Sequence, residues 1–273
     1  MIRLQVFGDP ALYQGEGAEP LRLVRQTKRF ALLLYLACSE ERAPRTRDDL
    51  VALFWPEADS HRAFNALRQG LFVIRRELGP EILNGVGSAH VSVNRSLLVS
   101  ELDLFMRSLQ AGAPAAALKL YRDDFLAGFH VSEAPEFCFW VEEERARIRN
   151  LAARAAEELA RVAEAHHDAA GALYWWRRAL ELDPFDEPTL RRIISLLVRS
   201  GNRSAAFTEF VRFQQRAEKE LGIELSPMTV QLAARAARGD AGGDYPWAGD
   251  RRESSGPATH RSRFRRATDR YPL

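Results

Sequence analysis

The hydrophobic pattern of the first hundred residues predicts short strands, then three helices, then a hairpin. Apolar side chains at Ile2, Leu4 and Val6 alternate with polar ones, which is typical of a half-buried strand. Two further short strands are predicted at 12–13 and 21–23. Helical spacing follows over three stretches, from 27 to about 37, from 46 to 54 and from 59 to about 78.

Polar residues and glycines mark where these helices begin and end. Thr27 suits an N-cap, and Thr46 with Asp49 three residues later resembles a capping box. Gly79-Pro80 ends the third helix, and a β-hairpin with its turn at 85–88 is expected after it. This order predicts a winged helix-turn-helix with a small N-terminal β-sheet over residues 1–100.

The third predicted helix has an apolar face and a polar face. The second helix of a helix-turn-helix lies in the major groove, where arginine can bond to guanine and asparagine or glutamine to adenine. The candidate base-reading residues on its polar face are Asn65, Arg68, Gln69 and Phe72, the last against a thymine methyl group. The candidate phosphate-binding residues are Arg62, Arg75 and Arg76.

A polar helix face with several arginines can also be no more than a solvated surface. The strands and helices before the third helix and the hairpin after it favour the DNA-binding interpretation. Gly70 lies inside this helix, where glycine costs up to about 1 kcal/mol against alanine. We therefore expect Gly70 to permit the close approach of another helix.

Residues 101–237 have helical spacing almost throughout, which makes the protein mainly α. Helices are predicted at 113–127, 137–165, 169–182, 189–200 and 204–221. Ala169 and Ser204 fall at equivalent points about 35 residues apart, close to the tetratricopeptide period. An all-α stack of tetratricopeptide-like helix pairs is expected, and such stacks form surfaces for protein partners.

Two groups of residues in this part are expected to have structural roles. The charges at 142–149 are interpreted as mostly a solvated helix face. The aromatic residues expected in the core are Phe137, Phe139, Trp140, Trp175 and Trp176.

Composition and charge set the last segment apart. The chain has 273 residues with 46% apolar and 28% charged residues, which is typical of a soluble globular protein. The net charge of +2 conceals mildly basic ends and a mildly acidic middle. Residues 238–273 have almost no aliphatic side chains, so a disordered basic tail is expected. Its arginines at 261–266 could attract DNA non-specifically, and a solvated tail without a role is the alternative.

Few features suggest catalysis, a cofactor, a metal or a membrane. The longest apolar run, 30–38, is too short to cross a bilayer, and no secretory signal is visible. Two distant cysteines, Cys38 and Cys138, suit a reducing cytoplasm. The six histidines form no zinc motif, and no nucleophile elbow or nucleotide-binding loop occurs. A small-molecule effector in a cleft of the helical part is left open.

Several segments resemble those of SARP-type bacterial activators, which carry a response-regulator-type winged helix and a bacterial transcriptional activator domain. These segments are 53–59, 62–69, 74–79, 120–129 and 218–227, together with Phe137, Trp140 and Arg145. They follow the family's order, and the resemblance covers about residues 1–237. The sequence departs from the family at Asp123-Asp124, where glycine is usual, and at Gly70, where alanine is common.

The resemblance implies a sequence-specific DNA-binding transcriptional activator. Such a protein binds double-stranded promoter DNA at direct repeats, self-associates there head to tail and recruits RNA polymerase. The domains implied are a winged helix at 1–100 and an activator domain at 101–237, followed by the tail. The resemblance adds phosphate contacts from Thr46 and Arg47, and a wing that reaches the minor groove near Arg95. The alternative is a protein-interaction adaptor whose winged helix no longer binds DNA.

Overall fold

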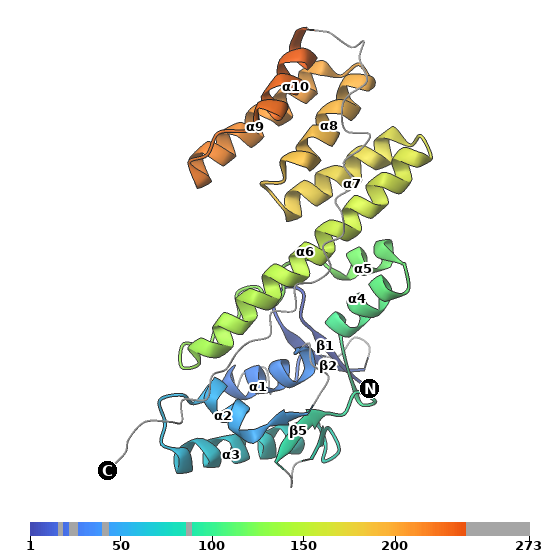
Figure 1. The fold of residues 1–273 in the computed structure, drawn as a ribbon. Coiled ribbons are helices and arrows are strands. Elements are labelled where there is room, and N and C mark those ends of the chain that lie inside the picture. The colour runs from blue at the N-terminus through green and yellow to red at the C-terminus, as the bar shows by residue number, and fades with distance from the viewer. Residues whose placement is uncertain (16–18, 22–26, 40–43, 86–88, 239–273) are drawn as a thin grey trace, which may run out of the picture.

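The computed structural model describes residues 1–15, 19–21, 27–39, 44–85 and 89–238. The ribbon is elongated, with the N-terminal elements at one end and the C-terminal helices at the other, and the long helix α6 (Pro135–Ala165) runs between them (Figure 1). Most described residues are helical, which confirms the mainly α fold class. The predicted strand at 21–23 and the turn at 85–88 lie partly outside the described residues, and the segment 239–273 lies wholly outside them.

The N-terminal sheet has three short strands. β1 (Ile2–Gln5) is central and pairs antiparallel with β2 (Ala11–Gln14) and parallel with β6 (Leu98–Ser100). The predicted alternation is confirmed, because Ile2 and Leu4 are buried whereas Arg3 is exposed. β6 was not predicted, since three residues are too few to show a period.

The winged helix follows in the predicted order. Its helices are α1 (Thr27–Cys38), α2 (Arg47–Phe54) and α3 (Ser60–Leu78). The strands of the second sheet are β3 (Arg45–Thr46), β4 (Leu83–Asn84) and β5 (His90–Val93), with β5 in the middle. The hairpin of β4 and β5 is the predicted wing, which confirms the winged helix-turn-helix.

The next two helices differ from the prediction. α4 (Glu101–Gln110) was not predicted, and the helix predicted at 113–127 is the shorter α5 (Pro114–Leu120). The chain leaves the helical path after α5 because segment 121–126 pairs with the chain beyond β1. The backbone N–H of Gly8 donates to the carbonyl of Asp124 at 3.0 Å, and that of Leu126 donates to the carbonyl of Val6 at 2.8 Å.

The C-terminal helices lie within a few residues of their predicted bounds. They are α7 (Ala169–Leu182), α8 (Glu187–Arg199) and α9 (Arg203–Leu221), capped by the side chains of Asp168, Asp186 and Asn202. Each helix packs on the next one, which confirms the helical repeat. α10 (Pro227–Arg238) was not predicted.

The molecule has two hydrophobic cores, and the change between them falls within α6. The first core runs from β1 through the winged helix, α4 and α5 into α6 as far as Ala153, and it also includes Leu182 at the end of α7. The second core begins at Ala160 and continues through α7–α10 to Ala236. The first core therefore crosses residue 100, so the winged helix shares a packed interior with the helices that follow it.

The predicted aromatic core is confirmed with one exception. Phe137 and Trp176 are buried, and Trp140 and Trp175 are partly buried against the cores. Phe139 is 67% exposed, so its prediction as a core residue was wrong. It lies two positions after Phe137 on α6, which turns it to the opposite side of the helix.

Candidate nucleic-acid interface

The second sheet holds the start of α2. The hydroxyl of Thr46 accepts a hydrogen bond from the backbone N–H of Asp49 at 3.1 Å, which confirms the predicted N-cap. The backbone N–H of Arg47 donates to the carbonyl of Ala89 at 3.0 Å. The structure thus brings Thr46 and Arg47, two candidate phosphate contacts, next to the hairpin.

Helix α3 is fixed by its cap and by its apolar face. The Asp59 carboxylate accepts the backbone N–H of Arg62 at 3.0 Å, while Leu67, Leu71 and Ile74 are fully or almost fully buried. A Cβ atom added at Gly70 would lie 3.3 Å from Cδ2 of Leu32 in α1. The close approach expected at Gly70 is therefore present, and it seats α3 on α1.

The outer face of α3 presents candidate base-reading side chains to solvent. Arg68 and Gln69 are exposed, and neither makes a hydrogen bond or ion pair with any described residue. Phe72 is 62% exposed, although its side chain is large and apolar. Asn65 is half-buried, and its Nδ2 lies 3.3 Å from Nδ1 of His61. These four residues share one face of the helix, with Asn65 nearest to its N-terminus.

The candidate phosphate-binding arginines of α3 have local partners. Arg62 pairs with Asp59 at 3.1 Å, and its side chain stays 85% exposed. Nε of Arg75 donates to the carbonyl of Pro80 at 2.8 Å, just beyond the end of α3. Arg76 pairs with its neighbour Glu77 at 2.9 Å. Such exposed contacts contribute little, so the three arginines could exchange them for phosphates at low cost.

Arg95 follows the C-terminal end of β5. The connection between β4 and β5 precedes that strand, and its residues 86–88 lie outside the described range. The guanidinium of Arg95 pairs with Asp103 of α4 and donates to the carbonyl of Ala37 at 3.1 Å. The structure therefore does not bring Arg95 together with the other candidate residues but places it between α1 and α4.

A buried carboxylate connects the N-terminal sheet to α4. Glu101 accepts the backbone N–H groups of Val6 at 3.1 Å and of Phe7 at 3.3 Å. Its other oxygen accepts from Arg122 at 2.6 Å. The carboxylate thereby satisfies two backbone donors at the end of β1 and links them to the segment after α5.

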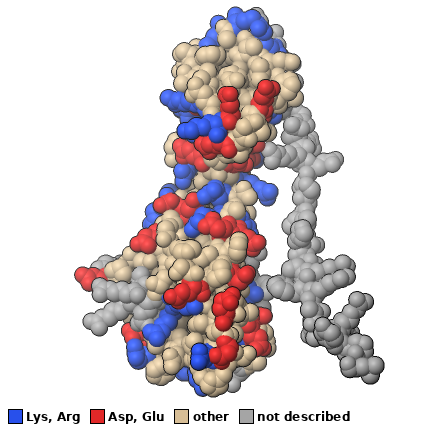
Figure 2. Space-filling view, turned by 90° about the vertical axis from the view of Figure 1, so that its left-hand side faces the viewer, with Lys and Arg blue, Asp and Glu red and all other residues tan. Residues whose placement is uncertain are grey.

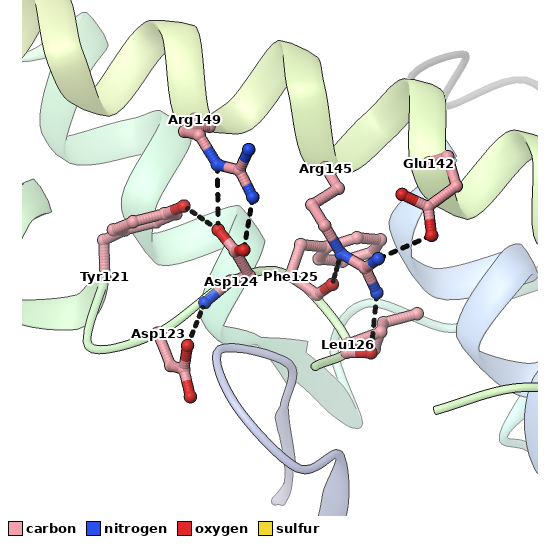
Figure 3. Close-up of polar contacts among 8 residues, drawn as sticks. All are labelled: Tyr121, Asp123, Asp124, Phe125, Leu126, Glu142, Arg145 and Arg149. Carbon is pink, nitrogen blue, oxygen red and sulfur yellow. Dashed lines mark hydrogen bonds and ion pairs between the residues drawn. The ribbon is translucent and has the colours of Figure 1, made fainter. Parts of the chain in front are cut away.

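Two arginines of α6 hold segment 121–126 (Figure 3). Arg149 donates to both carboxylate oxygens of Asp124, and the hydroxyl of Tyr121 donates to the same group at 2.8 Å. Arg145 donates to the carbonyls of Phe125 at 2.9 Å and Leu126 at 3.0 Å. The side chain of Arg145 is only 18% exposed. These contacts anchor the non-helical segment to α6.

The contacts around Asp124 shift the pKa values of Asp124 and Tyr121. Burial alone would raise the pKa of the Asp124 carboxyl, but the hydrogen bonds from Arg149 and Tyr121 outweigh burial and hold it below its ordinary value. Burial, followed by the bond to Asp124, raises the pKa of Tyr121. Asp124 is therefore ionised and Tyr121 protonated at neutral pH.

The interpretation of the charges at 142–149 as mostly a solvated face was wrong. Arg145 and Arg149 reach across to another segment, and Glu144 is buried beside Arg147, with which it pairs at 2.6 Å. Spacing along one helix cannot show a partner on another segment. The family resemblance could have indicated this contact, because it includes both segment 120–129 and Arg145.

Other site chemistry is sparse in the described residues. They contain no group of three or more histidine, cysteine or carboxylate side chains able to hold a metal ion. Burial raises the pKa of the Cys38 thiol, which keeps it protonated. No helix among the described residues has the length and apolar character required to cross a membrane.

Comparison with known proteins identifies the helical part. Residues 107–236 match the family model of the bacterial transcriptional activator domain. The structure of Mycobacterium tuberculosis EmbR in complex with a low affinity phosphopeptide is similar in fold, with a TM-score of 0.64 and 19% identity. The similarity covers 89% of this chain and 66% of that one, slightly less than two thirds. No curated protein matches the sequence.

The family match and the fold agree with each other. The matched residues begin in α4 and end in α10, so they include both the anchored segment and the helical repeat. The winged helix precedes them, as the resemblance implies. Residues 107–236 thus match the bacterial transcriptional activator domain, in a chain whose sequence resembles the SARP-type regulators.

Proposed function

We propose that the protein is a sequence-specific activator that reads double-stranded promoter DNA with α3. The outer face of α3 carries the proposal, because Arg68 and Gln69 are exposed without a partner among the described residues and Phe72 stands beside them. These side chains can contact guanine, adenine and a thymine methyl group. Asn65 adds a second amide closer to the helix N-terminus.

Phosphate contacts position this helix. Thr46 and Arg47 at the start of α2, and Arg62, Arg75 and Arg76 on α3, are the groups proposed to bind the backbone. The structure gives Arg95 a place between α1 and α4, so we propose for it a supporting role rather than a contact with DNA.

Assembly and activation belong to the same proposal. The helical domain provides surfaces for protein partners, and the resemblance implies head-to-tail binding to direct repeats and recruitment of RNA polymerase. The shared core and the anchor at segment 121–126 hold the winged helix and the first half of α6 together. DNA bound by α3 would therefore orient the helical domain relative to the promoter.

Fluorescence anisotropy with DNA from the gene's own upstream region tests base reading. The full chain is titrated against this duplex and a shuffled duplex over a salt series, with the double variant Arg68→Ala/Gln69→Ala beside it. We expect the wild type to prefer the upstream duplex at moderate salt. The double variant should lose this preference, since each base contact is worth about 1–3 kcal/mol.

Arg154→Ala is the matched control, because Arg154 is an exposed arginine on α6 far along the chain from α3. It should bind like the wild type. Equal binding of both duplexes by the wild type would contradict base reading, and the absence of binding at low salt would favour the adaptor. Transcription in vitro with purified RNA polymerase then tests activation, which should depend on the same two side chains.

A further inference from the structure

An exposed aromatic side chain on α6 lies among acidic ones. Phe139 is 67% exposed, with Glu136 one turn before it and Glu142 and Glu143 one turn after it. The opposite side of the helix packs into the first core through Phe137. We call Glu136, Phe139 and Glu143, which share one face at spacings of three and four, the acidic stripe.

The carboxylates of the stripe are available. Glu136 and Glu143 are exposed, and neither makes an ion pair or hydrogen bond with a described residue. Glu142 pairs with Arg145 at 2.6 Å, but its side chain is still 67% exposed. Figure 2 shows the side of the molecule that carries the start of α6, with both acidic and basic side chains around an uncharged area.

Each of the other strongly exposed aromatic residues of the described chain has an arginine one helical turn away, although Arg177 beside Tyr174 pairs with Glu209. Phe72 has Arg68 one turn before it, Tyr174 has Arg177 one turn after it, and Phe207 has Arg203 one turn before it. These relations follow from helical spacing of the sequence. Among these exposed aromatic residues, Phe139 therefore offers a negative rim, which selects a basic ligand with an apolar centre.

The chain contains a segment of that chemistry. Residues 261–266 read Arg-Ser-Arg-Phe-Arg-Arg, in which four arginines surround Phe264 and no acidic residue interrupts them. We propose that the acidic stripe binds this segment of the same chain, with Phe264 against Phe139 and the arginines beside Glu136 and Glu143. Aromatic rings attract each other edge to face or offset, and guanidinium groups pair with carboxylates.

The residues between α10 and the basic segment 261–266 determine how far that segment can reach. Arg261 follows Arg238, the end of α10, by about 23 positions, which can span up to roughly 75 Å at about 3.3 Å per residue. Phe139 lies about 26 residues before the end of α6, or roughly 39 Å at 1.5 Å per residue. A path along α6 therefore leaves roughly 36 Å of the segment's maximum span for the distance between the end of α10 and the end of α6.

This binding would keep the arginines of 261–266 away from DNA. A basic run adds non-specific affinity for any duplex, and a run held on α6 adds less. The inference does not depend on base reading by α3. It can fail while the proposed function stands, and the reverse is equally true.

Photo-crosslinking in the full chain tests the proposal. Phe264 is replaced by p-benzoylphenylalanine, the protein is irradiated, and the crosslinked peptides are identified by mass spectrometry. We expect crosslinks within one chain to residues 135–147. The double variant Glu136→Gln/Glu143→Gln should lower their yield roughly fivefold, and 0.5 M salt should lower it too, because exposed charges are screened.

Further variants test whether the crosslinks depend on the acidic stripe itself or on any exposed carboxylate or aromatic residue. Phe139→Ala should lower the yield as well. Glu158→Gln/Glu218→Gln removes two other exposed carboxylates that pair with no described residue, and it should leave the yield unchanged, as should Tyr174→Ala. Crosslinks to other segments, crosslinks between two chains, or a yield unaffected by the stripe variants would each overturn the proposal.

Discussion

Helices α3 and α6 both carry rows of arginines, and they use them in opposite ways. On α3, Arg68 points to solvent and contacts no described residue by a hydrogen bond or ion pair. On α6, Arg145 and Arg149 reach across to segment 121–126, and Arg145 is only 18% exposed. The two helices differ because segment 121–126 packs against the arginines of α6, whereas no described segment covers Arg68 on α3.

The segment opposite α6 needs these arginines. Residues after α5 leave the helical path, and the carbonyl of Phe125 has no backbone donor among the described residues, whereas that of Leu126 accepts the N–H of Phe129 at 3.1 Å. Arg145 donates to both carbonyls. No described segment covers Arg68, so its donors stay available to a ligand. The same residue type is therefore a structural clamp on one helix and a candidate reader on the other.

Arg145→Ala should have the largest effect and should separate the two roles. It removes charge-assisted hydrogen bonds to two backbone carbonyls, so the free energy of unfolding should fall by about 3 kcal/mol. Urea denaturation followed by circular dichroism measures this loss. Arg145→Lys should recover only part of it, since lysine lacks the planar fork of donors.

The control for this clamp is Arg154→Ala on the same helix, which should change stability by less than about 0.5 kcal/mol because Arg154 is exposed. DNA preference of Arg145→Ala, measured well below its unfolding temperature, should match the wild type. Equal stability of the Arg145→Ala and Arg154→Ala variants would show that Arg145 is no more important to the fold than a surface arginine.

Arg68→Lys should change DNA binding and leave stability unchanged, which is the reverse of the effect expected for Arg145→Ala. The charge is kept, so the salt dependence of binding should not change, whereas the bidentate contact with guanine is lost. We expect about 1–2 kcal/mol weaker binding to the upstream duplex and no change with the shuffled duplex. The unfolding temperature should stay that of the wild type. A parallel loss on both duplexes would mean that Arg68 contacts phosphate rather than a base.

Local sequence patterns predicted most of the winged helix and the helical repeat. The caps Thr46 and Asp59 are set by residues three positions apart, and Asp168 and Asn202 act in the same way on α7 and α9. Such signals are local, so they can be recognised without knowledge of the fold. The apolar stripe of α3 was likewise visible as a helical period.

Features that depend on distant partners could not be predicted in this way. β6 exists because it pairs with β1, nearly a hundred residues away, and α5 ends early because segment 121–126 pairs with the chain after β1. The charges on α6 looked solvated for the same reason. In the candidate site, the exposure of Arg68 and Phe72 agrees with the pattern, whereas the place of Arg95 depends on Asp103 and Ala37.

Gly70→Ala tests the close packing of α3 against α1, which positions the candidate base-reading face of α3. Alanine gains up to about 1 kcal/mol in helix propensity, but its Cβ would lie 3.3 Å from the buried end of Leu32. Overpacking of a core costs about 1–3 kcal/mol, so we expect a net loss near 1 kcal/mol. Thermal unfolding measures it. A rise in stability would show that Leu32 moves aside freely and that the helices do not need glycine there.

The pH dependence of the Asp124 pair should be the smallest effect. The pKa of Asp124 is lower than that of a free aspartate, so its ionised form stabilises the fold above about pH 4, and this contribution is lost as the pH falls through the folded pKa. The pair is partly exposed, with 40% of the Arg149 side chain and 32% of the Asp124 side chain accessible. Asp124→Asn should therefore cost less than about 1 kcal/mol at pH 7.

Denaturation of the wild type and Asp124→Asn at pH 7, 4 and 3 measures how this cost changes with pH. The difference between them should shrink toward pH 3, because protonation removes from the wild type the charge that the variant already lacks. Asp123→Asn is the matched control. Asp123 only accepts the backbone N–H of Asp124 at 2.7 Å, which asparagine can also do, so its cost should be small and nearly independent of pH. A difference for Asp124→Asn that stays constant down to pH 3 would mean that shape and hydrogen bonding, rather than charge, hold segment 121–126 on α6.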